Sequence, residues 1–167
     1  MAPFAARYAD RIVPLLESLV VDQAVPVREA TIPALEEASR TDVIPALTLL
    51  STLVRDPATS RPATSAFISV GASRVVEATP VLAALGKDTH SALRTAILEV
   101  AAQSGPDHPQ AAVTFLSPLV DDPDPTIRRR VGEVCSRIAQ TDAQAPLELL
   151  TRLVQDTQPD IRERALE

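Results

Sequence analysis

The chain has 167 residues, of which 46% are hydrophobic and 2% aromatic, and it carries a formal net charge of -6. This length and apolar content suffice for a continuous core without disulfides or metals. The negative charge argues against general nucleic-acid binding, which needs a basic surface to neutralise phosphates. Four glycines and no tryptophan favour packed helices over a β-sandwich and exclude a glycine-rich phosphate loop.

Cysteine content and hydropathy exclude two further classes of protein. The single cysteine, Cys135, cannot form an intramolecular disulfide, and its apolar neighbours predict a buried, inert thiol rather than a nucleophile. No apolar run approaches the roughly 18 residues of a membrane span, and the N-terminus lacks a signal-peptide pattern. We therefore expect a soluble, cytoplasmic protein with no membrane contact.

A short motif, Leu-x-x-Asp, divides the chain into repeats. Its aspartates stand at positions 22, 56, 88, 122 and 156, so that successive ones are 34, 32, 34 and 34 residues apart. Periods of this length indicate arrays of helical repeats. The predicted repeats span residues 8–41, 42–75, 76–108, 109–141 and 142–167, the last of them truncated, within a single domain 1–167.

The residues before each motif predict the first helix of a pair. In the first repeat Val13, Leu16 and Leu19 recur every three residues, and the later repeats show the same series, with Thr79 as the only polar member. Such a stripe is the mark of an amphipathic helix. Pro14, Pro33 and Pro118 fall inside predicted helices and should bend them.

A second helix is predicted after each aspartate. Five residues beyond it an apolar residue precedes arginine in four repeats: Val27-Arg28, Leu93-Arg94, Ile127-Arg128 and Ile161-Arg162. Prolines 26, 125 and 159 suit the first turn of a helix, and Asp124 suits the capping position. The second repeat differs, because it has Arg61-Pro62 at this point.

These elements predict an all-α protein, an alpha-alpha superhelix of about five helical hairpins with ten helices and no strand. One hairpin cannot bury its apolar stripe alone, so neighbouring hairpins must stack. The last predicted helix, which begins near Pro159, is about half as long as its counterparts. We expect this C-terminal repeat to self-associate end to end or to fray.

The repeated pattern resembles HEAT repeats over essentially the whole chain. The likeness lies in the repeat length, the paired helices, the proline within a helix, and an aspartate followed six residues later by arginine. It implies a structural ladder between neighbouring repeats formed by Asp22, Arg28, Asp88, Arg94, Asp122, Arg128, Asp156 and Arg162. In the second repeat Pro62 stands where the arginine should be.

Candidate catalytic groups are few. His90 and His108 are the only histidines, and neither belongs to a His-Glu pair of the kind that HEAT-like di-iron hydroxylases carry. No Gly-x-Ser-x-Gly elbow is present. We therefore predict no enzymatic activity, catalytic residue, cofactor or metal. The cluster Arg128-Arg129-Arg130 follows the acidic run 121–124, which favours a solvated or ladder role over protein or nucleic-acid binding.

The outward face of the second helices is the predicted partner site. Placing the apolar stripes inward leaves one to three side chains exposed per repeat, with Glu36, Glu37 and Glu163 among them, and the site is centred on Glu29, Phe67, Glu99, Arg129 and Glu133. Phe67 is its predicted aromatic anchor. Two alternatives stay open: this is an ordinary solvated face, or the second helix of repeat two is rotated so that Phe67 is buried.

The sequence supports two hypotheses about function. The first is a non-catalytic protein-protein interaction scaffold or adaptor that binds a protein partner on the concave second-helix face. The alternative is a regulatory or lyase-like HEAT subunit associated with an enzyme, similar to HEAT-like proteins that attach bilins. Such a subunit would bind a tetrapyrrole.

Overall fold

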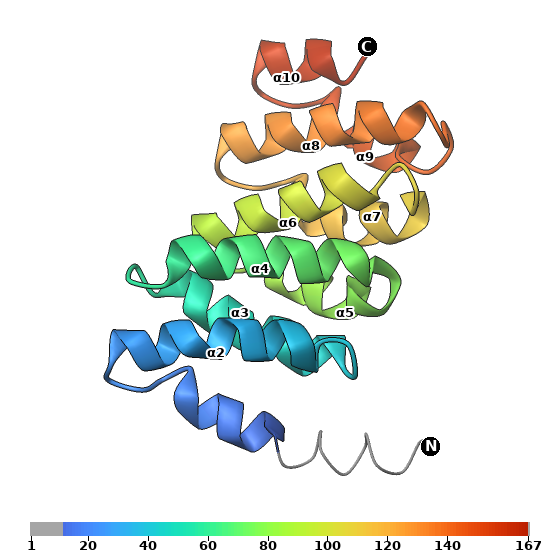
Figure 1. Ribbon diagram of the computed structural model, residues 1–167. Coiled ribbons are helices and arrows are strands. Elements are labelled where there is room, and N and C mark those ends of the chain that lie inside the picture. Colours follow the sequence, from blue (N-terminus) through green and yellow to red (C-terminus); the bar gives the residue numbers. More distant parts are fainter. Residues whose placement is uncertain (1–11, 167) are drawn as a thin grey trace. The chain divides into compact units, whose positions relative to one another are not determined.

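The computed structural model describes residues 12–166, and within them every regular element is a helix and no strand occurs. Residues 12–19 are helical. The following elements are α2 (Val25–Ala38), α3 (Val43–Arg55), α4 (Ser60–Ser73), α5 (Val75–Leu85), α6 (Ser91–Ser104), α7 (Pro109–Leu116), the 3-10 helix η1 (Ser117–Leu119), α8 (Pro125–Ala139), α9 (Leu147–Leu153) and α10 (Pro159–Arg164) (Figure 1). The predicted all-α class, built from HEAT-like helical hairpins, is confirmed.

The chain divides into two compact units, Met1–Val81 and Leu82–Glu167, which we call the N-terminal and C-terminal units. In the N-terminal unit α3 packs against both α2 and α4. Leu47, Leu50 and Leu53 of α3 are fully buried there, as are Leu35 of α2 and Phe67 of α4. The N-terminus of α3 is capped by Asp42, whose carboxylate accepts from the backbone N–H of Ile44 at 3.2 Å.

In the C-terminal unit α6, α8 and α10 are the second helices. Helix α8 packs against α6, α9 and α10 and buries Val131, Cys135 and Ile138. Its start is as predicted: Pro125 lies in the first turn, and the carboxylate of Asp124 accepts from the N–H of Thr126 at 2.8 Å.

Proline and glycine mark the ends of two helices. Helix α7 ends at Leu116, and the chain continues as the 3-10 helix η1, which contains Pro118. Pro33, in contrast, lies inside α2. Gly105 ends α6 with a helical φ of -59°, and a Cβ there would stand 2.4 Å from the carbonyl oxygen of Ala101 and 3.0 Å from Ile138. A side chain at position 105 would therefore clash with the last turn of α6 itself and crowd Ile138 of α8, although the φ at this position is one that any residue adopts.

The register of α4 corrects the prediction for Phe67. This side chain is fully buried, within a stripe of Ala63, Ala66, Phe67, Val70 and Gly71. In α6 the stripe includes Ile97, nine residues after Asp88 (97 - 88), but Phe67 lies eleven residues after Asp56 (67 - 56). Two additional residues therefore separate the aspartate from the stripe in repeat two.

A buried threonine stabilises this longer connection. The Thr59 hydroxyl donates to the carbonyl of Leu53 at 2.8 Å and lies 3.2 Å from a carboxylate oxygen of Asp56. With the two-residue shift, the position of the ladder arginine in repeat two is occupied by Thr64 and not by Pro62. The rotated helix that buries Phe67 is thus the correct alternative, and Phe67 is a core residue.

Candidate functional site

The aspartate of each repeat organises the loop between its two helices. One carboxylate oxygen accepts from the backbone N–H two residues further on, in all five repeats: Asp22 with Ala24, Asp56 with Ala58, Asp88 with His90, Asp122 with Asp124 and Asp156 with Gln158, at 2.7 to 3.0 Å. This is an Asx turn, which reverses the chain and starts the second helix.

The ladder arginines connect that loop with the next repeat. Arg28, Arg94 and Arg128 each donate through Nη1 to the carbonyl of the aspartate six residues earlier, at 2.6, 3.0 and 2.7 Å. Their Nε atoms lie 2.7, 2.6 and 2.6 Å from the carboxylates of Asp56, Asp122 and Asp156, respectively. Arg162 donates to the carbonyl of Asp156 at 2.7 Å in the same manner.

The three contacts between repeats differ in geometry. Arg128 binds Asp156 through two bonds, with Nη2 donating to Oδ1 at 3.0 Å, and the carboxylate is 6% exposed. Asp56 is 26% exposed and accepts one bond from Arg28. Arg94 Nε approaches Asp122 closely but is not aligned as a hydrogen-bond donor. The ladder is therefore strongest at Arg128.

Charge and hydrogen bonding shift the protonation of these groups. The bond from Arg128 lowers the pKa of Asp156 and correspondingly raises the pKa of Arg128. The pKa of Asp56 is also lowered, chiefly by the backbone N–H of Ala58 and further by Arg28. Each of these carboxylates is thus charged under ordinary conditions.

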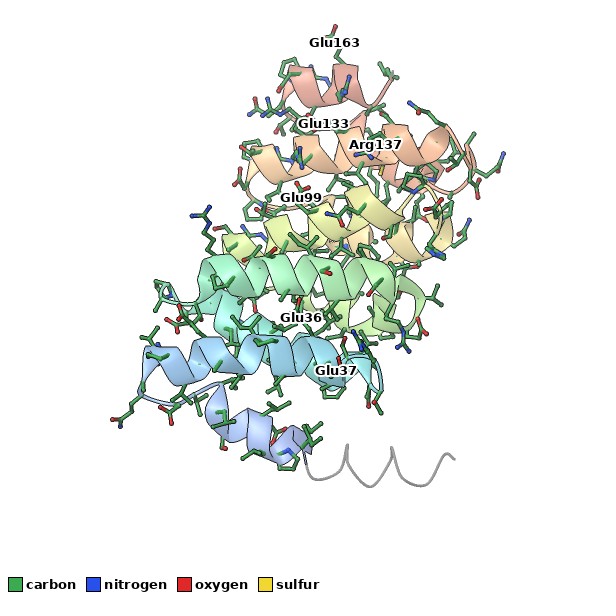
Figure 2. The ribbon with its side chains drawn as sticks, in the orientation of Figure 1. Glu36, Glu37, Glu99, Glu133, Arg137 and Glu163 are labelled. Carbon is green, nitrogen blue, oxygen red and sulfur yellow. The ribbon has the colours of Figure 1, made fainter. Side chains whose placement is uncertain are left out.

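The second-helix face of the C-terminal unit carries one glutamate on each of its three second helices: Glu99 of α6, Glu133 of α8 and Glu163 of α10 (Figure 2). Arg130 of α8 donates to the carboxylate of Glu99 and lies 3.6 Å from that of Glu133. Arg137 donates through Nη2 to the carbonyl of Ala102 at 3.0 Å. Two arginines therefore cross the space between α6 and α8.

The predicted site residues are not equivalent to one another. Glu29 and Arg129 are exposed, as expected. Glu99 and Glu133 are about one-third exposed, 37% and 34%, and both lie within reach of Arg130, which the sequence analysis did not assign to this site. Phe67 does not belong to this face.

The second-helix face of the N-terminal unit contains Glu36 and Glu37, both exposed, in the last turns of α2 (Figure 2). Glu37 pairs with Arg40 at 2.9 Å. An open hollow of about 410 Å³ lies between α2 and α4. It is lined by Pro33, Glu36 and Glu37 of α2, by Ser39 and Arg40 of the turn that follows α2, and by Ser69, Val70 and Ser73 of α4.

Groups suited to catalysis are dispersed. Burial raises the pKa of the Cys135 thiol to about 12, so it is protonated and unreactive at neutral pH. Across residues 12–166 no group of three or more His, Cys, Asp and Glu side chains could hold a metal ion. In the same stretch no helix has the length and apolarity needed to cross a membrane.

Comparison with protein families identifies the repeat. A protein-family model described as HEAT repeats matches residues 78–167, more than half of the chain. The chain belongs to the HEAT-repeat family, and the resemblance seen in its aspartate and arginine spacing is confirmed. HEAT repeats are generally protein-interaction scaffolds and are typically non-catalytic. No curated protein and no solved structure matches the chain.

Proposed function

We propose that the protein is a non-catalytic scaffold or adaptor that binds a protein partner on the second-helix face. The observation that carries this proposal is the separation of roles along the second helices α2, α6 and α8. One face supplies buried stripes such as Val131, Cys135 and Ile138 of α8, and the outward face presents charged side chains: Glu29 of α2, Glu99 of α6, and Arg129 and Glu133 of α8. Solenoid proteins use such a face to bind extended partners.

The proposed contacts are given for each unit by itself: Glu29 on the N-terminal unit, and Glu99, Arg129 and Glu133 on the C-terminal unit. Arg130 joins Glu99 and Glu133 and holds their side chains in fixed positions before a partner arrives. Pre-ordered side chains lose less conformational entropy on binding, which favours affinity. The ladder residues are proposed to have a structural role, since all of them bond the loop of their own repeat and Arg28, Arg94 and Arg128 also contact the aspartate of the next repeat.

Two matched double variants test this function. Glu29→Arg with Glu133→Arg reverses two charges on second helices. Glu17→Arg with Glu148→Arg makes the same change of net charge at exposed positions of first helices. Each variant and the parent protein are used as bait in lysate of the source cells, and the captured proteins are quantified by mass spectrometry.

Partners should be lost from the second-helix variant and kept by the first-helix variant. The reverse pattern would place the site on the first-helix face. Mixing the protein with a bilin tests the enzyme-associated alternative, because a stable new band of visible absorbance would favour that function over a scaffold.

A further inference from the structure

The hollow between α2 and α4 has a filled counterpart in the other unit. Counted from the repeat aspartate, Arg137 lies at position 15 (137 - 122), and the two-residue shift of repeat two places Ser73 at the same point of α4 (73 - 56 = 17). Arg130 corresponds likewise to Ala66. The two arginine side chains that α8 directs toward α6 are therefore replaced in α4 by the short side chains of Ala66 and Ser73.

The N-terminal unit nevertheless has hydrogen-bond acceptors at the position in α2 that corresponds to Ala102 of α6. Arg137 bonds the carbonyl of Ala102, fourteen residues after Asp88 (102 - 88), and the corresponding residue of α2 is Glu36 (36 - 22 = 14). Glu36 is exposed and lines the hollow. The atom equivalent to the Ala102 carbonyl is the backbone carbonyl of Glu36, which accepts from the hydroxyl of Ser39 at 2.6 Å. The side chain of Glu36 adds a carboxylate to the lining that Ala102 does not offer.

The cations around the hollow already have acceptors, some of them on residues that line it. Arg40 pairs with Glu37 at 2.9 Å. Arg74 donates to the carbonyls of Ser39 and Arg40 at 3.4 and 3.1 Å and pairs with Glu77 at 3.2 Å. Among the described residues no cation forms an ion pair with Glu36.

The direction of the helices affects the potential in the hollow, although Arg74 already bonds the carbonyls that follow α2. Helices α2 and α4 both pack on α3 as the second helices of their hairpins, so they run in the same direction, and the hollow lies beside the last turns of both. A helix C-terminus carries a partial negative charge that favours cations. The hydroxyl of Ser69, which is exposed at the rim, adds an uncharged hydrogen-bonding group.

We propose that the hollow between α2 and α4 receives an arginine side chain from an extended segment of a protein partner. The guanidinium would pair with Glu36 and take the place that Arg137 fills in the C-terminal unit, and its apolar stem would lie along Pro33 and Val70. A planar guanidinium with five donors suits a carboxylate flanked by hydroxyl oxygens better than a compact ammonium does. The inference rests on the proposed function, because it assumes a protein partner on this face.

Small probes and amide spectra of the isotope-labelled full chain test the proposal. N-acetyl-arginine amide should shift the amide signals of Glu36, Ser39 and Ser69, and the neutral isostere N-acetyl-citrulline amide should not. Glu36→Gln should weaken the arginine response about three- to fivefold, the size expected for one partly exposed ion pair. Glu163→Gln, which removes a glutamate from the second-helix face of α10, should leave it unchanged.

A second variant fills the hollow. Ser73→Arg restores the arginine that α8 carries, so it should pair with Glu36, abolish the response to the arginine probe and leave the melting temperature no lower than that of the parent. Four results would overturn the inference: no response at these amides, an equal response to citrulline, an equal response to N-acetyl-lysine amide, or a response to inorganic phosphate.

The two proposals fail in distinguishable ways. Loss of captured partners in Glu29→Arg with Glu133→Arg, together with full retention in Glu36→Gln and Ser73→Arg, would refute the arginine site and leave the scaffold function standing. An arginine response at Glu36 in a protein that captures no partner would refute the scaffold function alone.

Discussion

In the C-terminal unit Arg130 and Arg137 of α8 form hydrogen bonds with α6. In the N-terminal unit the corresponding residues of α4 are Ala66 and Ser73, and a hollow lies between α4 and α2. The loop aspartates and the arginines that bind them are nonetheless placed alike in both units, as in Arg28 with Asp56 and Arg128 with Asp156. Contacts that define the repeat are thus separate from the side chains that face outward. Recognition can change in one unit while the framework stays the same.

The largest expected effect tests whether α4 and α6 bury their stripes equally. Phe67→Ala should lower the free energy of unfolding by about 3–5 kcal/mol, and its counterpart Ile97→Ala by about 2–5 kcal/mol, because each leaves a cavity in the core. Ser69→Ala, at an exposed position of α4, should change it by no more than about 0.5 kcal/mol. Urea unfolding followed by circular dichroism measures all three. A loss of less than about 1 kcal/mol of unfolding free energy in Phe67→Ala would contradict the burial of that side chain.

Ladder strength should differ between the two units. Arg128→Ala removes a bidentate contact with a nearly buried carboxylate and should cost about 1–3 kcal/mol of unfolding free energy. Arg28→Ala should cost less, because Asp56 is one-quarter exposed and accepts a single bond from it. Arg129→Ala, on the same helix as Arg128 but exposed, serves as the control for urea unfolding. Equal losses of unfolding free energy in Arg28→Ala and Arg128→Ala would contradict the prediction that the ladder is stronger in the C-terminal unit.

Acid should weaken the ladder. The pKa of Asp156 in the folded protein lies below its ordinary value of 3.8, so the unfolded chain binds the proton more readily. The stabilisation is complete above the ordinary pKa and is lost as the pH falls through the lowered pKa. Thermal melting should therefore move to lower temperature between about pH 5 and pH 2, and less steeply in Asp156→Asn. An identical pH dependence in the variant would contradict the shift.

The smallest expected effect concerns the arginine that fills the space between α6 and α8. Arg137→Ser makes α8 resemble α4 at this point and removes one bond to the Ala102 carbonyl, so it should cost about 0.5–1.5 kcal/mol of unfolding free energy. The variant should also acquire a response to N-acetyl-arginine amide at the signals of α6. A stable variant that shows no such response would indicate that the two spaces are not equivalent.

Much of the fold was predictable because its signals are local. Proline in the first turn of a helix, the Asp124 cap and the apolar stripes each act within a few residues, and the repeat spacing joins them into hairpins. The aspartate and arginine spacing also led to the correct family. Helix α4 was misread because its register was counted from Asp56 across a connection with two additional residues.

The correct register of α4 was nevertheless present in the sequence. The segment Ala66-Phe67-Ile68-Ser69-Val70-Gly71-Ala72 matches Ala96-Ile97-Leu98-Glu99-Val100-Ala101-Ala102 position by position in its apolar residues. Aligning the stripes, instead of counting from the aspartate, would have placed Phe67 in the core. Local apolar pattern is the better guide wherever loop length varies.

The family resemblance predicts a ladder between repeats, but the exact partner of each side chain is harder to predict, since it depends on how neighbouring repeats pack. Arg130 with Glu99 and Arg152 with Asp121 are both separated by 31 residues, and the ladder pairs by 28. These separations equal the 34-residue period less three or six, so each contact joins two positions that are not equivalent within the repeat. Such offsets follow from helix packing angles, which residue types alone do not reveal.

The ladder arginine has a consequence for how the chain can change in length. It holds the carbonyl of its own loop with one nitrogen and the carboxylate of the following loop with another, so a repeat carrying both residues offers a donor at one side and an acceptor at the other. A whole repeat of 34 residues could be inserted or deleted between two others and each arginine would still meet an aspartate. Duplication or deletion of a repeat that carries both residues can therefore change the length of such an array and still leave each ladder arginine facing an aspartate.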